Sequence, residues 1–470
     1  MRASFIFFTL QLLAAVACAQ QSAPMDWVDF RSRVLAFHPL ARQADLYRDM
    51  ARAGLLRAKG GFDPKAYADL SGKNFKDKTY YQYGEAGVKW PLWLGLELKG
   101  NYNQASGTFL NPESALPEAG QVAAGISWTL GQGLLMDERR YNLRQGRIGL
   151  EQGDAERSLF LNDLLLEAAK AYWNWVVTGN VLEVYEEALR QAQIRHEALL
   201  ESFRQGDKPA IDTLETFIQV QNRRLDTNFA QIDRQNAALA LNNFLWSDNG
   251  LPLSPAQVPS TPSLLVAGAL PPALPDTEPL LETARTRHPE IRLYQIKQTL
   301  LDVELQWKKE KRKPVFDLNY HFLGNGWQFF PAAGDEGFGV LANNVKWGVQ
   351  FSYPLPNRKA RGDWQLTRIK MAQTDLQLQQ KKTEIENKVR QYRNELANLS
   401  AQIELFGAIT ENYRVLLEAE NEKFRFGESS VFLINTREQR WLDARVKYLK
   451  LLSEFQKTAA GLQWAAGSLQ

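Results

Sequence analysis

Apolar residues recur at steps of three and four along residues 136–244 and predict a long helical hairpin. They lie at Leu182, Tyr185, Leu189, Ala192, Leu199 and Phe203 before a short polar segment, and at Ile211, Leu214, Ile218, Leu225 and Ile232 after it. This spacing keeps one stripe of each helix facing a partner helix. Between the arms, Gly206 suits the left-handed conformation that ends a helix, and Pro209 suits the first turn of the next. The first arm predicts a helix of about 70 residues, which rises about 100 Å.

Other stretches alternate apolar and polar residues and predict β-strands at residues 88–102, 121–130, 315–322 and 345–353. The third stretch places Phe316, Leu318, Tyr320 and Phe322 on one face and Asp317, Asn319 and His321 on the other. Such strands are typical of outer-membrane β-barrels, although the face of a soluble β-sandwich alternates in the same way. Aromatic residues between the last two strands favour the barrel; these are Trp327, Phe329 and Phe330.

The number of strands decides how a barrel is closed. Residues 88–102 are expected to form one strand with Trp90, Leu92 and Leu94 on its apolar face, which gives four clear strands; an extra hairpin in this region would give six. An open sheet edge cannot lie in lipid, and a closed barrel needs about eight strands or more. Three chains that supply about twelve strands would close it. The pattern therefore predicts a homo-oligomer, most simply a trimer.

The chain repeats its own organisation. His38-Pro39 and a helical stretch at 27–59 in the first half correspond to His288-Pro289 and a helical stretch at 280–311 in the second. Strands and a long helix follow in both halves, and the two long helices end alike, in ESFRQG and EKFRFG. The second long helix has the cleaner heptad spacing of apolar residues, which include Ile385, Val389, Leu396 and Ile403. We therefore expect one repeat at residues 20–246 and a second at 280–470, joined by a proline-rich linker at 247–279.

The N-terminus predicts export from the cytoplasm. Residues 1–19 contain Arg2, an apolar run and then small residues, as in a secretory signal peptide. Cleavage before Gln20 fits the Ala-Cys-Ala sequence, whereas a weak lipobox at 15–18 would leave Cys18 lipidated; both interpretations stay open. No later stretch has eighteen consecutive apolar residues, so we expect no membrane-spanning helix.

Composition and motifs argue against a catalytic or metal-binding function. The formal net charge of +3 gives no reason to expect a nucleic-acid partner, and a single cysteine excludes a disulfide framework or a thiolate metal site. The sequence contains no nucleophile elbow, zinc-protease motif or phosphate-binding loop. We therefore expect no enzymatic activity, no cofactor and no bound metal.

The duplicated halves, the His-Pro-led helices, the strands between helices and the glycine turn of each hairpin together resemble the TolC family of outer-membrane efflux ducts. The resemblance covers essentially the whole mature chain. It implies an α+β membrane protein in which three protomers share a helical α-barrel and a small antiparallel transmembrane β-barrel. It also implies an outer-membrane location with a long periplasmic extension, and two partners: a periplasmic adaptor protein and an inner-membrane transporter.

The resemblance places Gly206 and Gly427 at two periplasmic tips. Charged neighbours are candidate adaptor contacts, although exposed charges also suit helix ends; they are Arg204, Lys208, Arg425 and Glu428. Asp212 is a candidate gate residue or a first-turn acid favoured by the helix dipole, and the second copy has Leu433 at that position.

Other conspicuous residues are expected to be structural. We expect His38 and His288 to start helices, and Tyr172, Trp173 and Trp175 to pack between helices. His321 is expected to face the barrel lumen. The predicted function is a passive export duct of a tripartite efflux pump or type I secretion system, gated at its tips. A periplasmic coiled-coil adaptor or scaffold is the alternative, and the strand at 345–353 argues against it.

Overall fold

The computed structural model describes residues 24–112, 115–253, 261–264, 274–327 and 344–469. They form two compact units, each with segments from both predicted repeats: Met1–Leu46, Glu156–Ile291 and Lys381–Gln470 in the first, and Tyr47–Ala155 and Arg292–Gln380 in the second. The predicted signal peptide with Cys18, parts of the linker, and Phe329 and Phe330 lie outside the described residues.

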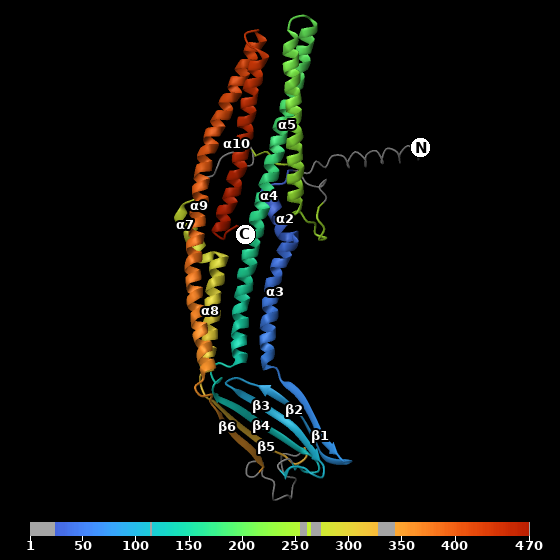
Figure 1. Cartoon of the computed structure of the whole chain (residues 1–470), viewed down its shortest axis with the longest axis vertical. Helices are drawn as coiled ribbons and strands as arrows, with labels where there is room; N and C mark the ends of the chain where they lie inside the picture. Colours follow the sequence, from blue (N-terminus) through green and yellow to red (C-terminus); the bar gives the residue numbers. More distant parts are fainter. Residues whose placement is uncertain (1–23, 113–114, 254–260, 265–273, 328–343, 470) are drawn as a thin grey trace, which may run out of the picture. The chain divides into compact units, whose positions relative to one another are not determined.

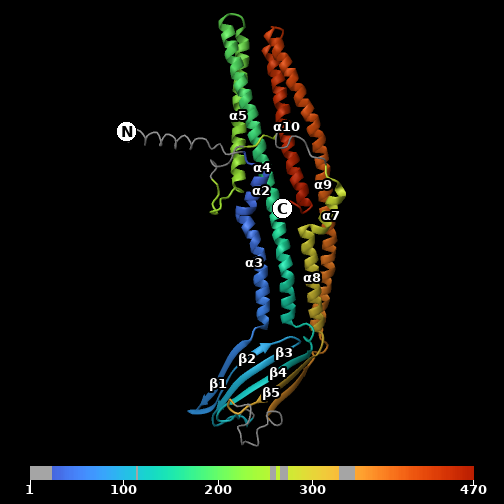
Figure 2. The same cartoon turned by 180° about the vertical axis from the view of Figure 1, so that it is seen from behind.

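Two long helical hairpins make up most of the first unit, and their long helices begin in the second. Helix α4 (Glu138–Arg204) pairs with α5 (Ala210–Asn242), and α9 (Arg358–Arg425) pairs with α10 (Val431–Ala465) (Figures 1 and 2). The long helices contain 67 and 68 residues, which confirms the predicted length. On α9 the predicted heptad seam is buried at Ile385, Val389, Leu396 and Ile403.

The predicted seam on α5 is wrong. Its large apolar residues are exposed: Ile211, Leu214, Ile218, Leu225 and Ile232. The buried face of α5 instead carries mainly small and polar residues at heptad spacing: Thr216, Val220, Arg223, Ala230, Ala237 and Leu241. Small side chains let the two helices approach closely, and the Thr227 hydroxyl donates to the Tyr185 carbonyl on α4 at 3.3 Å. The apolar residues predicted as a seam therefore form an exposed stripe on the side of α5 that α4 does not cover.

The shorter helices are broken by the two His-Pro pairs. Helix α2 (Trp27–Phe37) precedes α3 (Pro39–Lys59), and α7 (Thr277–Arg287) precedes α8 (Pro289–Glu310). At each break the histidine backbone is extended, and its ring Nδ1 accepts the backbone N–H two residues later, from Leu40 at 3.1 Å and from Glu290 at 3.2 Å. Each histidine thus caps the following helix, in the manner of an N-cap side chain.

A cluster of aromatic residues forms the core beside α2. The side chains of Phe30, Tyr172 and Trp175 are almost fully buried. The Phe30 and Tyr172 rings stack with centroids 5.2 Å apart, and the Tyr172 hydroxyl donates to the Met25 carbonyl at 2.9 Å. Burial raises the pKa of Tyr172. The predicted packing role of this cluster is confirmed.

The second unit contains a six-stranded sheet. Its strands follow chain order, and each neighbouring pair is antiparallel (Figure 1): β1 (Lys65–Phe75), β2 (Lys78–Pro91), β3 (Leu96–Ser106), β4 (Gln121–Gly131), β5 (Val315–Leu323) and β6 (Val345–Ser352). A short 3₁₀ helix, Gly60–Phe62, leads from α3 into β1. The sheet has six strands among the described residues rather than four.

The predicted single strand at 88–102 is wrong, because the chain turns within it. Strand β2 ends at Pro91, whose missing N–H cannot extend the ladder, and β3 begins at Leu96. Leu94 and Gly95 in the turn have positive φ angles of 60° and 75°. A side chain at Gly95 would meet the Thr129 carbonyl oxygen at 2.5 Å. Trp90 and Leu98 nevertheless share a face, because they are direct cross-strand partners.

The two faces of the sheet differ in polarity as predicted. One face exposes apolar and aromatic side chains on every strand from β2 to β6; they include Val88, Trp90, Leu98, Ile126, Trp128, Phe316, Tyr320, Trp347, Val349 and Phe351. The other face carries polar groups, among them Asn101, which is only 8% exposed. A sheet in water normally buries its apolar face. In this sheet the apolar face is exposed instead.

Candidate functional site

The two hairpin tips have the same backbone geometry. At the first, the Gly206 N–H donates to the Phe203 carbonyl at 3.0 Å and the Asp207 N–H to the Ser202 carbonyl at 2.9 Å. Gly427 and Glu428 repeat both hydrogen bonds at 3.0 and 2.9 Å. The glycines have φ angles of 87° and 80°, and nothing lies within 4 Å of a Cβ added to either. The glycine is therefore required for its left-handed backbone and not for space.

The predicted contact residues behave differently at the tips. The Arg204 guanidinium pairs with Glu201 on its own helix at 3.4 Å, and both side chains are exposed. The Lys208 amino group instead lies 5.1 Å from the centre of the Phe424 ring, so it joins the first tip to the second. Arg425 and Glu428 are exposed. These charges are all within one turn or two of the glycines.

Asp212 lies in the first turn of α5 and is half-buried. Its N–H donates to the Pro209 carbonyl at 3.2 Å. Leu433, at the corresponding position of the second hairpin, is 39% exposed. Acidic residues near the second tip lie elsewhere: the Glu420 carboxylate accepts from the Ser429 hydroxyl at 2.6 Å and lies 3.6 Å from the Arg437 guanidinium. The hydrogen bond from Ser429 lowers the pKa of Glu420, and the nearby Arg437 lowers it further.

A buried ion pair joins the two hairpins. The Arg195 guanidinium of α4 contacts the Glu438 carboxylate of α10 at 2.9 Å, and Glu438 is only 4% exposed. Arg195 also donates to the Asn435 side chain at 3.2 Å, and the Asn435 amide donates to Glu215 of α5 at 3.4 Å. Three helices thus meet at one charged contact.

A second buried arginine lies further from the tips. Arg223 of α5 is 1% exposed; it pairs with Asp226 at 3.0 Å and donates to the Gln439 side chain of α10 at 2.7 Å. Its Nε has no hydrogen-bond partner among the residues that the structure describes. Such a group stabilises the packed state weakly, because desolvation offsets much of the attraction between charges. The sequence signal for this site is the heptad spacing of polar and small residues on α5, which the larger apolar residues of the same helix obscure.

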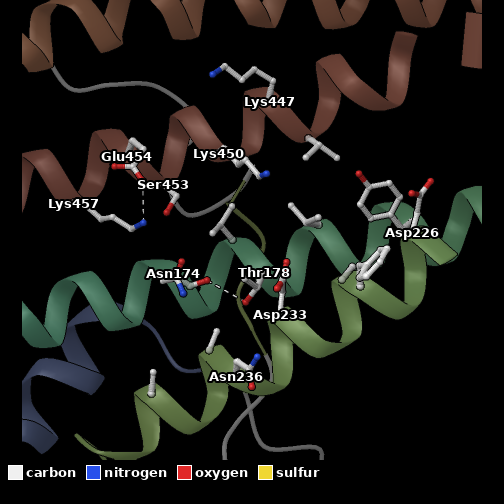
Figure 3. A pocket seen from close by; sticks show the side chains of 18 residues that line it. Asn174, Thr178, Asp226, Asp233, Asn236, Lys447, Lys450, Ser453, Glu454 and Lys457 are labelled. Carbon is white, nitrogen blue, oxygen red and sulfur yellow. Dashed lines mark hydrogen bonds and ion pairs between the residues drawn. The ribbon is translucent and has the colours of Figure 1, made fainter. Parts of the chain in front are cut away.

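A groove of about 830 Å³ is lined by α4, α5 and α10 (Figure 3). Asp226 and Asp233 line it from α5, and Lys447, Lys450 and Lys457 from α10. Lys457 pairs with Glu454 on its own helix at 2.9 Å. No ion pair connects the two charged walls among the described lining residues. The groove therefore presents opposite charges on opposite sides.

The described residues contain no group of three or more His, Cys, Asp and Glu side chains placed to hold a metal ion.

Within the described part of the chain, no helix combines the length and apolar character needed to cross a membrane.

The polar face of the sheet is the other candidate site. The Glu85 carboxylate on β2 accepts from the Tyr67 hydroxyl at 2.6 Å and pairs with the Lys99 amino group at 2.8 Å. Asn101 donates to the Asn103 side chain at 2.8 Å. His321 is on this face as predicted, opposite Gly125, where a side chain would meet the imidazole Nδ1 at 2.3 Å. Glycine at that position leaves room for the histidine ring.

Comparison with solved structures identifies the fold. The Campylobacter jejuni CmeC outer membrane channel is 15% identical, with a TM-score of 0.66 over 94% of this chain and 85% of that one. The outer membrane protein VceC from Vibrio cholerae is 12% identical, with a TM-score of 0.65 over 94% and 96%. The open state of the Neisseria gonorrhoeae MtrE outer membrane channel is 13% identical, with a TM-score of 0.66 over 94% and 89%.

No family model matches the sequence, and no curated protein does. At these low identities the likeness concerns the fold. The chain has the fold of outer-membrane channels, and the predicted TolC-like architecture of duplicated long helical hairpins and a small antiparallel sheet is confirmed.

Proposed function

We propose that the chain is an outer-membrane channel and acts as a passive export duct of a tripartite efflux pump or type I secretion system. The observation that carries the proposal is the polarity of the sheet. Its exposed face is apolar and rich in aromatic residues, and Trp347 is 70% exposed. Water would not stabilise that arrangement, whereas the hydrocarbon core of a membrane would. The polar face then lines an aqueous lumen.

The sheet needs other copies of itself to close. Strands β1 and β6 are its two edges, and each leaves a row of backbone groups unpaired. Unpaired backbone groups are costly in lipid, so both edges must find partners there. With an even number of antiparallel strands, β1 runs antiparallel to β6 of a neighbouring copy. Three copies would form an eighteen-stranded barrel, which is wider than the twelve-stranded one that the sequence suggested.

The exposed stripe on α5 supports the same assembly. Leu225 and Ile232 lie on the opposite side of the helix from its buried residues Arg223 and Ala230. An apolar stripe at heptad spacing suits a second helix, and α4 already covers the other face. We infer that a neighbouring protomer packs against this stripe. The helices of three protomers would then complete a helical tunnel around one axis.

The hairpin tips are the proposed docking points for a periplasmic adaptor protein, which would link the duct to an inner-membrane transporter. Arg204, Lys208, Arg425 and Glu428 would make the contacts, and the exposure of Arg204, Arg425 and Glu428 supports this role. Opening would separate the hairpins, so the contacts between Lys208 and Phe424 and between Arg195 and Glu438 would hold the closed state. Asp212 would lie at the narrow end of the tunnel.

Conductance of the purified full chain in a planar lipid bilayer tests this proposal. We expect long-lived channels whose open probability rises in Glu438→Gln, because that change removes a contact that holds the hairpins together. The control Glu187→Gln removes a surface pair with Arg190 and should open no more than wild type. A chain that is found only in the soluble periplasm and forms no channel would refute the duct. It would also favour the adaptor alternative, which has no support from the fold comparison.

A further inference from the structure

Lysine occupies four of the six positions of one cross-strand row of the sheet. Direct partners connect all six strands at this level: Lys65, Lys89, Lys99, Gly125, His321 and Lys346. Residues paired in this way point to the same face, and that face is the polar one, which carries Glu85 four residues from Lys89 and Asn101 two residues from Lys99. Four lysines and a histidine thus share one line on the proposed lumen.

Most of this positive charge is not neutralised within the described residues. Lys99 pairs with Glu85. The Lys89 amino group lies 4.3 Å from the centre of the Tyr67 ring, and no ion pair involves Lys65, Lys89 or Lys346 among the described side chains. Like charges directly opposite each other destabilise a sheet. The pairing of Lys65 with Lys89 and of Lys89 with Lys99 therefore lacks a reason in the stability of the sheet alone.

Carboxylates on the same face occupy other rows. Glu97 belongs to the adjacent row, and Asp69 and Glu85 are paired with one another two rows away on the other side. Successive rows on one face are about 7 Å apart along the backbone, but the Glu85 side chain reaches back to the row and pairs with Lys99 at 2.8 Å. Positive charge without an ion-pair partner among the described side chains therefore remains at Lys65, Lys89 and Lys346, although the whole face is close to neutral.

The row also crosses the sheet from one end to the other. Lys65 is the first residue of β1 and follows helix α3 closely, whereas Lys346 is the second residue of β6, at the end of the strand away from α9. Strand β1 therefore extends to one side of the row and β6 almost wholly to the other. This stagger is what tilted barrel strands require. Five steps of about 4.8 Å make the row about 24 Å long.

We propose that the lysine row is an anion-guiding track through the barrel and that the exported substrate carries carboxylate or phosphate groups. This inference rests on the proposed duct. Each protomer supplies one inclined track, which starts at the helical end of the lumen and reaches the far end. The row itself contains no carboxylate, and because Glu85 pairs with Lys99, the amino groups that attract the anion are those of Lys65, Lys89 and Lys346. Rings and lines of lysine select anions in pores in this way.

The test is the reversal potential of the purified channel in a planar bilayer under a potassium chloride gradient. Wild type should prefer chloride. Lys65→Gln, Lys89→Gln and Lys346→Gln combined should lower the chloride-to-potassium permeability ratio by about tenfold, because a cleft lined by one charge concentrates counter-ions by about that factor or more. The control combines Lys76→Gln and Lys78→Gln, which removes charge at the β1–β2 turn, away from the row, and should change the ratio little.

The outcomes separate this inference from the duct itself. Wild-type channels that prefer potassium, or a lysine-row variant that conducts with unchanged selectivity, would overturn the anion track and leave the duct standing. Absence of any conductance in wild type would overturn both. Light scattering on the same samples shows whether the variants keep the particle mass of wild type, so that altered selectivity reports on the lumen and not on assembly. A selectivity change in the row variant alone supports the track.

Discussion

Protonation of His288 should destabilise the chain in mild acid. The imidazole is 4% exposed, and its Nδ1 accepts the Glu290 N–H at 3.2 Å, so this nitrogen must be unprotonated for the cap to form. The backbone of Gly467 lies against the histidine; a Cβ there would be 3.0 Å from the His288 Cα. Burial lowers the pKa of His288 from 6.5 to about 4; Glu290 opposes this shift, while Lys388 and Lys381 add to it.

The sign and size of the effect follow from that shift. Between about pH 4 and pH 6.5 the unfolded chain binds a proton that the folded chain does not, so stability is fully present above this window and falls as the pH drops through it. The loss is about 2 kcal/mol at pH 5 and about 3 kcal/mol at pH 4, for each chain. His38 forms the equivalent cap, and burial lowers its pKa as well.

Thermal melting of the detergent-solubilised protein from pH 7.5 to pH 4.5 measures this loss. The matched variant is His288→Asn, because asparagine also caps a helix but does not titrate. Below pH 6.5, the melting temperature of wild type should fall more steeply with decreasing pH than that of the variant. Above pH 7, the two proteins should show the same pH dependence. Hydrogen–deuterium exchange at the imidazole C2 position gives the pKa directly. Equal pH slopes, or a measured pKa near 6.5, would refute the reasoning.

Three further perturbations act on separate parts of the structure. Gly206→Ala should lower the free energy of unfolding by about 1 kcal/mol, since an alanine is strained at positive φ, and an unchanged denaturation midpoint would contradict this. Glu438→Gln should cost about 3 kcal/mol by leaving the partly buried Arg195 without its ion-pair partner, whereas Glu187→Gln should cost under about 1 kcal/mol in the same melting assay. Leu225→Gln combined with Ile232→Gln should reduce the fraction of assembled particles in size-exclusion chromatography; full assembly would show that no protomer covers the stripe.

Local sequence rules predicted the features that depend on one segment. Heptad spacing predicted the length of α9 and its buried residues, because a heptad repeat of that length is compatible with few structures other than a packed helix. Gly206 and Gly427 followed from the rarity of left-handed residues other than glycine at helix ends. The apolar faces of β4, β5 and β6 followed from period-two alternation.

Features that depend on several segments were not predictable in the same way. On α5, periodicity located the apolar stripe around Leu225 but could not say which neighbour covers it. Strand β1 has only small residues and Leu70 on its apolar face, so its alternation was too weak to detect. The turn after Pro91 is rich in leucine and tryptophan and therefore resembled a strand. Arg195 and Glu438 are 243 residues apart in the sequence, and only the packed structure places them together.

The polar candidate sites show the same division. The sequence predicted that these charges lie beside the two tip glycines, but only the structure shows that Lys208 contacts Phe424 of the other tip. The lysine row needed the register of five strand pairs before its members could be aligned. Its residues come from both halves of the chain, so no local motif contains it. Sheet register is set by turns and burial together, which sequence patterns specify incompletely.

The central claim is that several chains pool their strands to close one barrel in the outer membrane. Multi-angle light scattering of the detergent-solubilised particle from the outer-membrane fraction, corrected for bound detergent, measures the protein mass directly. Three chains of 53.5 kDa, less any cleaved signal peptide, are expected in each particle. A particle that contains a single chain would contradict the account, because the two edges of a six-stranded sheet would then have no partner strands.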